Sequence, residues 1–114
     1  MPLLTPVQFL DELRKVQFKT FPTLTGEAVI TGRGLNRNNG YKYCRASGTG
    51  VVVTLPFNAI YNTYAHFHGK KGITSNEVGI QLGTYKAYRN FWMDLMVEMK
   101  LVTQTSSSPV TIDM

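Results

Sequence analysis

The chain has 114 residues, 43% of them apolar, and its 12 lysines and arginines against 7 acids give a formal net charge of +5. This length predicts one domain, residues 1–114, with one hydrophobic core, and the apolar content excludes a disordered tail. No apolar run reaches the roughly 20 residues that span a bilayer, and the first residues lack the basic leader of a signal peptide. Because the single cysteine, Cys44, cannot form an internal disulfide, we expect a cytoplasmic protein without membrane association.

Positive charge is concentrated in the middle of the chain. Between Ala28 and Asn76 there are six basic residues and no acid, so this block carries +6 and the rest of the chain −1. Such a local excess favours a polyanionic partner such as nucleic acid. The alternative is a solvated region that happens to lack acids. The six residues are Arg33, Arg37, Lys42, Arg45, Lys70 and Lys71.

The first segment predicts a helix from Pro6 to about Lys19. Thr5 suits the N-cap, and proline suits the first helical position. Residues 21–26 then break the helix. Its apolar residues form one stripe that either covers the rest of the core or serves as a homodimer contact: Phe9, Leu10, Leu13 and Val16.

Residues 27–55 have the composition of β-structure. We expect strands at 27–35, 41–46 and 51–55, with turns at Asn39-Gly40 and at Ser47–Gly50. The first two strands form a hairpin with four basic side chains. Arg37 and Lys42 are placed at its tip, and Arg33 and Arg45 lower on its arms.

The second half predicts three helices and a second hairpin. A helix over 57–68 places Ile60, Tyr64 and Phe67 on one side. A short helix follows, capped by Thr74 and Glu77 in a capping box and ended by Gly83.

The next predicted helix covers residues 84–100. Its inner stripe is Tyr88, Trp92, Leu95 or Met96, and Met99. Two short β segments, 101–105 and 110–112, surround a polar turn at 106–109 and form the second hairpin.

This order of helix, short helix, turn, longer helix and hairpin is the winged helix-turn-helix plan. Residues 73–102 resemble the DNA-binding core of MarR-type and related bacterial winged-helix regulators. Their pattern begins with an apolar residue followed by Thr. After two residues of any type it continues with Glu-Leu-Ala, and after two more with Leu-Gly. A helix that ends in Gly-Leu-Val follows. It matches at Ile73, Thr74, Glu77, Val78, Leu82, Gly83, Leu101 and Val102.

With the preceding helix and the hairpin, the resemblance covers residues 57–112, and the residues before Phe57 match no family. The expected fold class is therefore α+β, a winged helix-turn-helix with an N-terminal helix and a basic β-hairpin. Within the single domain, residues 1–55 form the N-terminal part and 56–114 the winged-helix core.

The resemblance implies that the helix from Tyr85 lies in the major groove of double-stranded DNA. The side chains suited to contact there are Thr84, Tyr85, Lys86, Arg89 and Asn90. Thr74 and Ser75, at the start of the short helix, would contact phosphate, and so would Lys70 and Lys71. The basic hairpin of Arg33, Arg37, Lys42 and Arg45 would grip the backbone or a neighbouring groove.

These residues also have simpler interpretations. Lys86 and Arg89 are equally typical of solvated helix surface, and the aromatic residues Tyr85, Tyr88, Phe91 and Trp92 of core or dimer surface. His66 and His68 point about 200° apart on a helix and so do not form a metal site, and no base is indicated beside Cys44. We therefore expect no enzyme, cofactor or metal.

Two hypotheses for the function follow. The first is a small double-stranded DNA-binding regulator of bacterial, phage or plasmid origin. The second is a small adaptor or inhibitor of a mobile element, such as an anti-defence protein, which binds another protein through a winged-helix frame. The basic block and the polar, cationic start of the helix from Tyr85 favour the first. The turn at 106–109, which has no lysine or arginine, and the aromatic residues of that helix leave room for the second.

Overall fold

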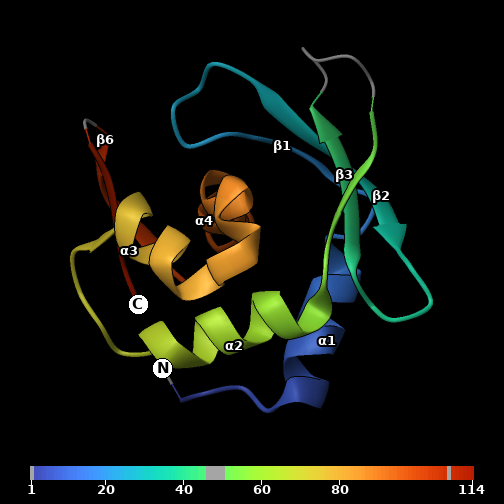
Figure 1. The fold of residues 1–114 in the computed structure, drawn as a ribbon, viewed down its shortest axis with the longest axis horizontal. Helices are drawn as coiled ribbons and strands as arrows, with labels where there is room; N and C mark the ends of the chain where they lie inside the picture. Colours follow the sequence, from blue (N-terminus) through green and yellow to red (C-terminus); the bar gives the residue numbers. More distant parts are fainter. Residues whose placement is uncertain (1, 46–50, 108) are drawn as a thin grey trace.

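A four-stranded and a three-stranded antiparallel sheet lie around a central helix in the computed structural model, which describes residues 2–45, 51–107 and 109–114 (Figure 1). The expected α+β class is confirmed. The helices are α1 (Pro6–Lys15), α2 (Phe57–Phe67), α3 (Ser75–Leu82), the 3₁₀ helix η1 (Gly83–Tyr88) and α4 (Arg89–Glu98). The strands are β1 (Thr20–Pro22), β2 (Val29–Leu35), β3 (Tyr41–Arg45), β4 (Val53–Leu55), β5 (Ile73–Thr74), β6 (Thr103–Ser107) and β7 (Val110–Asp113).

Helix α1 begins where the sequence predicts but ends earlier. Thr5 forms a capping box with Gln8, as its position before Pro6 predicts. The prediction of a helix to Lys19 is wrong, because the backbone after Val16 pairs with β2 instead. The Gly32 N–H donates to the Lys19 carbonyl and the Gly34 N–H to the Gln17 carbonyl, both at 2.8 Å.

The first sheet has the strand order β1-β2-β3-β4. The predicted hairpin is confirmed as β2 and β3, but it is the centre of a sheet rather than a free arm. Strand β1 lies in the segment predicted as a break, where Phe21 is buried opposite Ile30. Its Pro22 is tolerated because β1 is an edge strand. At the other edge, Val51 and Val52 are exposed and precede β4, so the predicted buried strand is shorter than expected.

The β2–β3 turn uses its asparagines as the sequence predicts. The Asn36 side chain accepts from the N–H groups of Asn38 and Gly40 at 2.9 and 2.7 Å, and Asn39 has a φ of +62°. A Cβ on Gly40 would lie 2.9 Å from Thr54, so glycine is required by close approach. The other predicted turn, Ser47–Gly50, lies outside the described residues.

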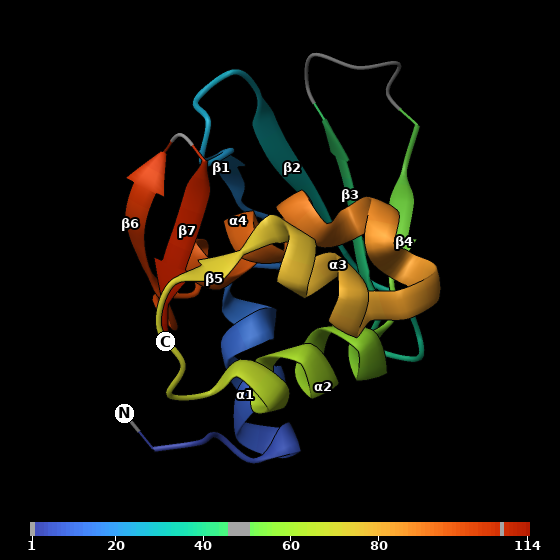
Figure 2. The same ribbon diagram turned by 60° about the vertical axis from the view of Figure 1, so that its left-hand side comes forward.

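The second sheet has the order β5-β7-β6. The predicted C-terminal hairpin is confirmed as β6 and β7, and β5, which the sequence did not indicate, adds to β7 by pairing Ile73 with Ile112. Helices α2 and α3 agree closely with their predictions (Figure 2).

The predicted helix over residues 84–100 is wrong in its first part. Gly83 has a φ of +62°, and the chain continues as the 3₁₀ helix η1, in which Tyr85 departs from helical geometry. The α-helix α4 begins only at Arg89. Its residues from Phe91 to Met96 are all buried, rather than one stripe of them, because α4 passes between α2, α3 and the first sheet (Figure 1).

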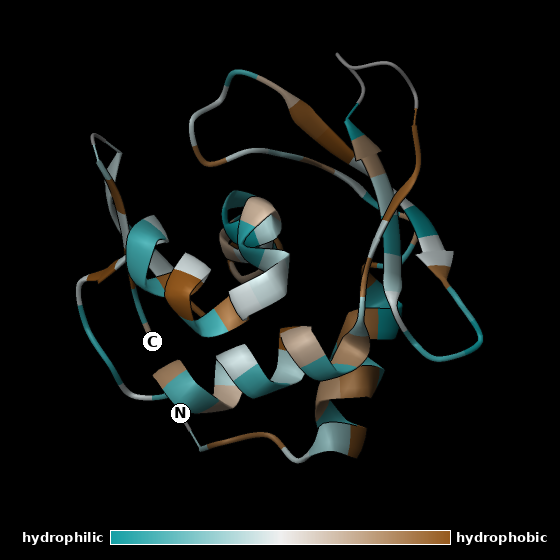
Figure 3. Ribbon diagram, in the orientation of Figure 1, coloured by the Kyte–Doolittle hydropathy of each residue, from teal (hydrophilic) through white to brown (hydrophobic). Residues whose placement is uncertain are grey.

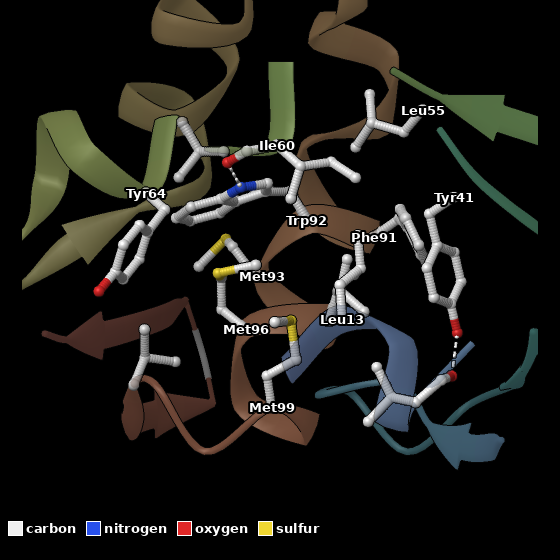
Figure 4. Packing of buried hydrophobic residues seen from close by; sticks show 14 of the residues in the cluster. Leu13, Tyr41, Leu55, Ile60, Tyr64, Phe91, Trp92, Met93, Met96 and Met99 are labelled. Carbon is white, nitrogen blue, oxygen red and sulfur yellow. Dashed lines mark hydrogen bonds between the residues drawn. The ribbon is translucent and has the colours of Figure 1, made fainter. Parts of the chain in front are cut away.

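One hydrophobic cluster joins both halves of the chain around α4 (Figure 4). The Trp92 Nε1 donates at 3.1 Å to the carbonyl of Ile60 on α2, and the Phe91 ring stacks on Tyr43 of β3 at 3.5 Å between centroids. Phe9 and Leu13 of α1 are fully buried in the same cluster. The apolar stripe of α1 therefore covers the core, and a homodimer through α1 would need other residues, such as the exposed Val7.

Tyr41 provides a test of this packing. Its hydroxyl donates at 2.6 Å to the buried carbonyl of Val16 and so anchors the end of α1 on the sheet (Figure 4). We expect Tyr41→Phe to lower the free energy of unfolding by about 1–2 kcal/mol, because the carbonyl loses its partner in the core. Urea unfolding measured by Trp92 fluorescence gives this value.

The matched control is Tyr61→Phe. The Tyr61 hydroxyl also donates to a carbonyl, that of Leu4 at 2.8 Å, but at a partly exposed position where water replaces it. Equal losses in the two variants would contradict the role given to Tyr41.

Candidate nucleic-acid interface

A shallow groove of about 500 Å³ lies between the start of α3 and the η1–α4 junction. It combines two basic side chains, small polar residues and one exposed apolar side chain. Three of its lining residues, Ser75, Lys86 and Arg89, belong to the set predicted from the sequence. The lining is Ser75, Asn76, Gly79, Ile80, Lys86 and Arg89.

The capping box of α3 fixes one wall of the groove. Thr74 Oγ1 accepts from the Glu77 N–H at 3.2 Å, and Glu77 Oε1 accepts from the Thr74 N–H at 3.3 Å, as the sequence predicts. Figure 3 shows that this end of α3 is hydrophilic. Ser75 and Asn76 lie in the first turn, where backbone N–H groups and the helix dipole favour an anion.

The opposite wall is formed by the turn after Gly83. The positive φ of Gly83 reverses the chain so that η1 packs against α3. Arg89 Nη1 donates at 3.0 Å to the carbonyl of Lys86, which draws the guanidinium toward the exposed Lys86. A Cβ on Gly79 would lie 3.0 Å from Arg89 Cδ, so glycine leaves room for this side chain to cross α3.

Nothing acidic lines the groove. In the described part of the chain, the ion pairs are Arg14–Asp11 and Lys15–Glu12, both within α1. Lys86 and Arg89 take part in neither, so the groove has a positive potential that a phosphate can neutralise.

The other residues predicted for this site lie near the groove but do not line it. Lys70 lines a neighbouring depression with Ile80, which also borders the groove. Lys71 points elsewhere and donates at 3.3 Å to the carbonyl of Met114. Thr84 is exposed on η1, whereas Tyr85 is half-buried and stacks with Tyr88 at 6.3 Å.

The basic hairpin does not join the groove. The β2–β3 turn with Arg37 lies on the opposite side of the molecule from α3 (Figure 1). The prediction that Lys42 is at the tip is wrong, since Lys42 lies within β3 opposite Thr54 of β4. Arg33 is exposed on β2, and Arg45, at the end of β3, borders a different cavity.

That second cavity, of about 220 Å³, lies between the β1–β2 loop, the end of β3 and α4. Asp94, 4% exposed, forms part of its wall, and Asn90 lies one turn earlier on the same helix. Asp94 Oδ1 accepts at 2.9 Å from the Leu24 N–H, but Oδ2 has no partner among the described residues. This site was not among the residues predicted from the sequence, although an acid within the apolar run Phe91–Met96 is a signal for it.

Burial raises the pKa of Asp94 to about 6, because the low-dielectric surroundings disfavour the carboxylate. The hydrogen bond from Leu24 and the charge of Arg45 oppose this rise in the pKa. At neutral pH the side chain is therefore mostly ionised with one unpaired oxygen, an arrangement that costs stability in the absence of a hydrogen-bond donor.

Comparisons with known proteins do not extend these observations. No model of a known protein family matches the sequence, no curated protein matches it, and no solved structure matches its fold. In the described residues, no three His, Cys, Asp or Glu side chains form a group that could hold a metal ion. None of the described helices has the length and apolar character to cross a bilayer.

The pKa of Asp94 predicts a pH-dependent stability. Folding raises this pKa from 3.8 to about 6, so the folded state binds the proton more tightly than the unfolded state. The contribution of Asp94 to stability is complete below about pH 4 and is lost as the pH rises through 6. Relative to Asp94→Asn, we expect the free energy of unfolding of the wild type to fall by up to roughly 3 kcal/mol between pH 4 and 7.

Urea unfolding of both proteins across this pH range measures the difference. The asparagine variant is the control, because it keeps the shape of the side chain and removes its titration. Parallel stability profiles of the two proteins would show that Asp94 does not titrate in the folded state as described.

Proposed function

We propose that residues 57–112 form a winged helix-turn-helix that binds double-stranded DNA as a small regulator. The order α2, α3, turn, α4, β6–β7 supports this fold, as does the sequence resemblance over residues 73–102. The observation that carries the function is the groove in which the start of α3 faces Lys86 and Arg89, with no acidic residue in its lining.

The proposed contact is with the phosphate backbone rather than through α4 deep in the major groove. Residues Phe91–Met96 are buried and cannot face bases, which leaves the first turn of α4 and η1. Lys86 and Arg89 supply cations, and the N-terminal amides of α3 with Ser75 supply donors. Thr84 and Asn90, both exposed, are the side chains left to reach base edges.

The basic hairpin then has a different role from the groove in DNA binding. Arg33, Arg37 and Lys42 do not line the groove, and the β2–β3 turn lies on the opposite side of the molecule from α3 (Figure 1). They extend the positive surface away from the groove. In this proposal they raise the rate of association through the long-range field. A homodimer would double the phosphate contacts, and the reduced Cys44 fits a cytoplasmic location.

Fluorescence anisotropy with a random-sequence duplex tests the proposal. We expect salt-dependent binding by the wild type and a loss of about tenfold or more in Lys86→Ala/Arg89→Ala at low salt. The slope of log affinity against log salt should fall by about 2, because two phosphate contacts are lost. Circular dichroism checks that the variant is folded.

The matched control is Arg14→Ala/Lys15→Ala, which removes the same charge from exposed positions on α1. If this control weakens binding as much as the groove variant does, net charge and not the groove binds DNA. If the wild type does not bind the duplex at low salt, the proposal is wrong.

The adaptor hypothesis has one observation in its favour. Ile80, 75% exposed, lies within the groove, and its apolar side chain offers no hydrogen bond or charge to a DNA backbone. A protein partner would bury this side chain, and such binding would persist at high salt. Ile80→Ser would then weaken binding of the protein partner, whereas it leaves phosphate contacts unchanged.

A further inference from the structure

The cavity beside Asp94 has a floor and a rim of different character. Its floor consists of residues that are almost fully buried, namely Thr23, Met93 and Asp94. Its rim consists of exposed residues with charged or polar ends, namely Thr25, Glu27, Arg45 and Asn90. Leu24, Ala28 and Val110 complete the wall with apolar surface.

The charges around the cavity are not neutralised by one another. Arg45 is close enough to influence Asp94 electrostatically, yet in the described structure it forms no ion pair with Asp94 or with Glu27. One cation and two carboxylates thus surround the same space. Thr23, by contrast, is satisfied by Thr25 and by the backbone of Ala28. Asp94 Oδ2 is the group on the floor that still lacks a donor.

We propose that this cavity binds a small zwitterion of the α-amino-acid class. The ammonium group donates to Asp94 Oδ2 and faces Glu27, and the carboxylate pairs with Arg45. A simple amine would leave Arg45 unpaired, and a simple carboxylate would meet the repulsion of Asp94 and Glu27. A ligand with both charges complements both the cation and the carboxylates that line the cavity.

The volume limits the size of the ligand. At about 30 Å³ for each water-sized group, 220 Å³ holds about seven such groups. Glycine, alanine and serine, with about five to seven non-hydrogen atoms, fit this space, whereas an aromatic amino acid does not. The apolar wall suits a methyl or a short side chain.

Entry of the ammonium group requires movement of the β1–β2 loop, because Asp94 is almost completely covered. The Leu24 N–H that donates to Asp94 Oδ1 belongs to this loop, so a movement of the loop changes the hydrogen bonding of the carboxylate. Binding supplies the donor that Oδ2 lacks and removes the cost of an unpaired buried acceptor.

NMR titration of the ¹⁵N-labelled chain at pH 7.5 tests the proposal, with L-alanine as the probe and ethylamine and propionate as half-ligands. We expect saturable shifts of the Leu24, Arg45 and Asn90 amides with L-alanine, and binding at least about tenfold weaker for each half-ligand. Arg45→Gln, at an exposed position, should weaken L-alanine binding by about tenfold. Lys42→Gln, on the outer face of the same strand, is the control and should not.

Asp94→Asn adds a second readout. In the wild type, L-alanine binding should weaken as the pH falls below about 6, because the protonated carboxyl no longer attracts the ammonium group. The other charged or titratable groups facing Asp94 are Arg45 and Tyr43 on β3 and Glu27 in the loop, and of the two acids only Asp94 is buried. Binding to the asparagine variant should be weak at every pH.

Three results would overturn the inference. They are the absence of shifts with L-alanine, glycine and L-serine up to about 10 mM, shifts confined to residues away from the cavity, or undiminished binding in Arg45→Gln. The inference is independent of DNA binding, because the titration contains no DNA.

Discussion

The structure depends on the burial of the middle of α4, residues Phe91–Met96. A helix that is apolar on all sides is stable only when it is surrounded, and the run Phe91–Met96 is covered by elements from both halves of the chain. Trp92 fixes it to α2 through the Ile60 carbonyl, and Phe91 fixes it to β3 by stacking on Tyr43. Without the N-terminal sheet, this face of α4 would be exposed. Helix α1 and the first sheet are therefore part of the same core rather than an appended arm.

This burial determines which surfaces remain for binding. The middle of α4 cannot contact a partner, so the available positions are its first turn, η1 before it and α3 beside it. Lys86 and Arg89 are in this region and line the same groove, and the bond from Arg89 to the Lys86 carbonyl holds the guanidinium at the η1–α4 junction. The electrostatic repulsion between two exposed cations is small in water, and a phosphate that lies between them offsets it. For the proposed function, the burial of Phe91–Met96 thus favours contact with the DNA backbone over contact with its bases.

Local signals in the sequence predicted the elements that local interactions create. The capping boxes of Thr5 and Thr74, the Asn36–Gly40 turn and the positive φ of Gly83 all require only neighbouring residues. Strands β1 and β5 could not be predicted in this way, because two or three residues become a strand only by pairing with β2 or β7. Of the candidate site, Ser75, Lys86 and Arg89 were predicted and brought together, while the hairpin arginines were not. The cavity at Asp94 depends on the β1–β2 loop, whose position no local pattern specifies.

The groove and the cavity share one turn of helix. Arg89 lines the groove, whereas Asn90 and Asp94, four residues apart on one face of α4, line the cavity. A ligand that draws Asn90 or Asp94 toward the β1–β2 loop acts on the same rigid backbone that carries Arg89. Coupling between the two proposed sites would require two positions of this turn for which each ligand has different affinity, and the coupling would then be reciprocal. Asp94 Oδ2, unpaired in the described structure, would gain a donor from the proposed ligand. The buried acid thus costs stability in the described structure, and the proposed ligand would remove this cost.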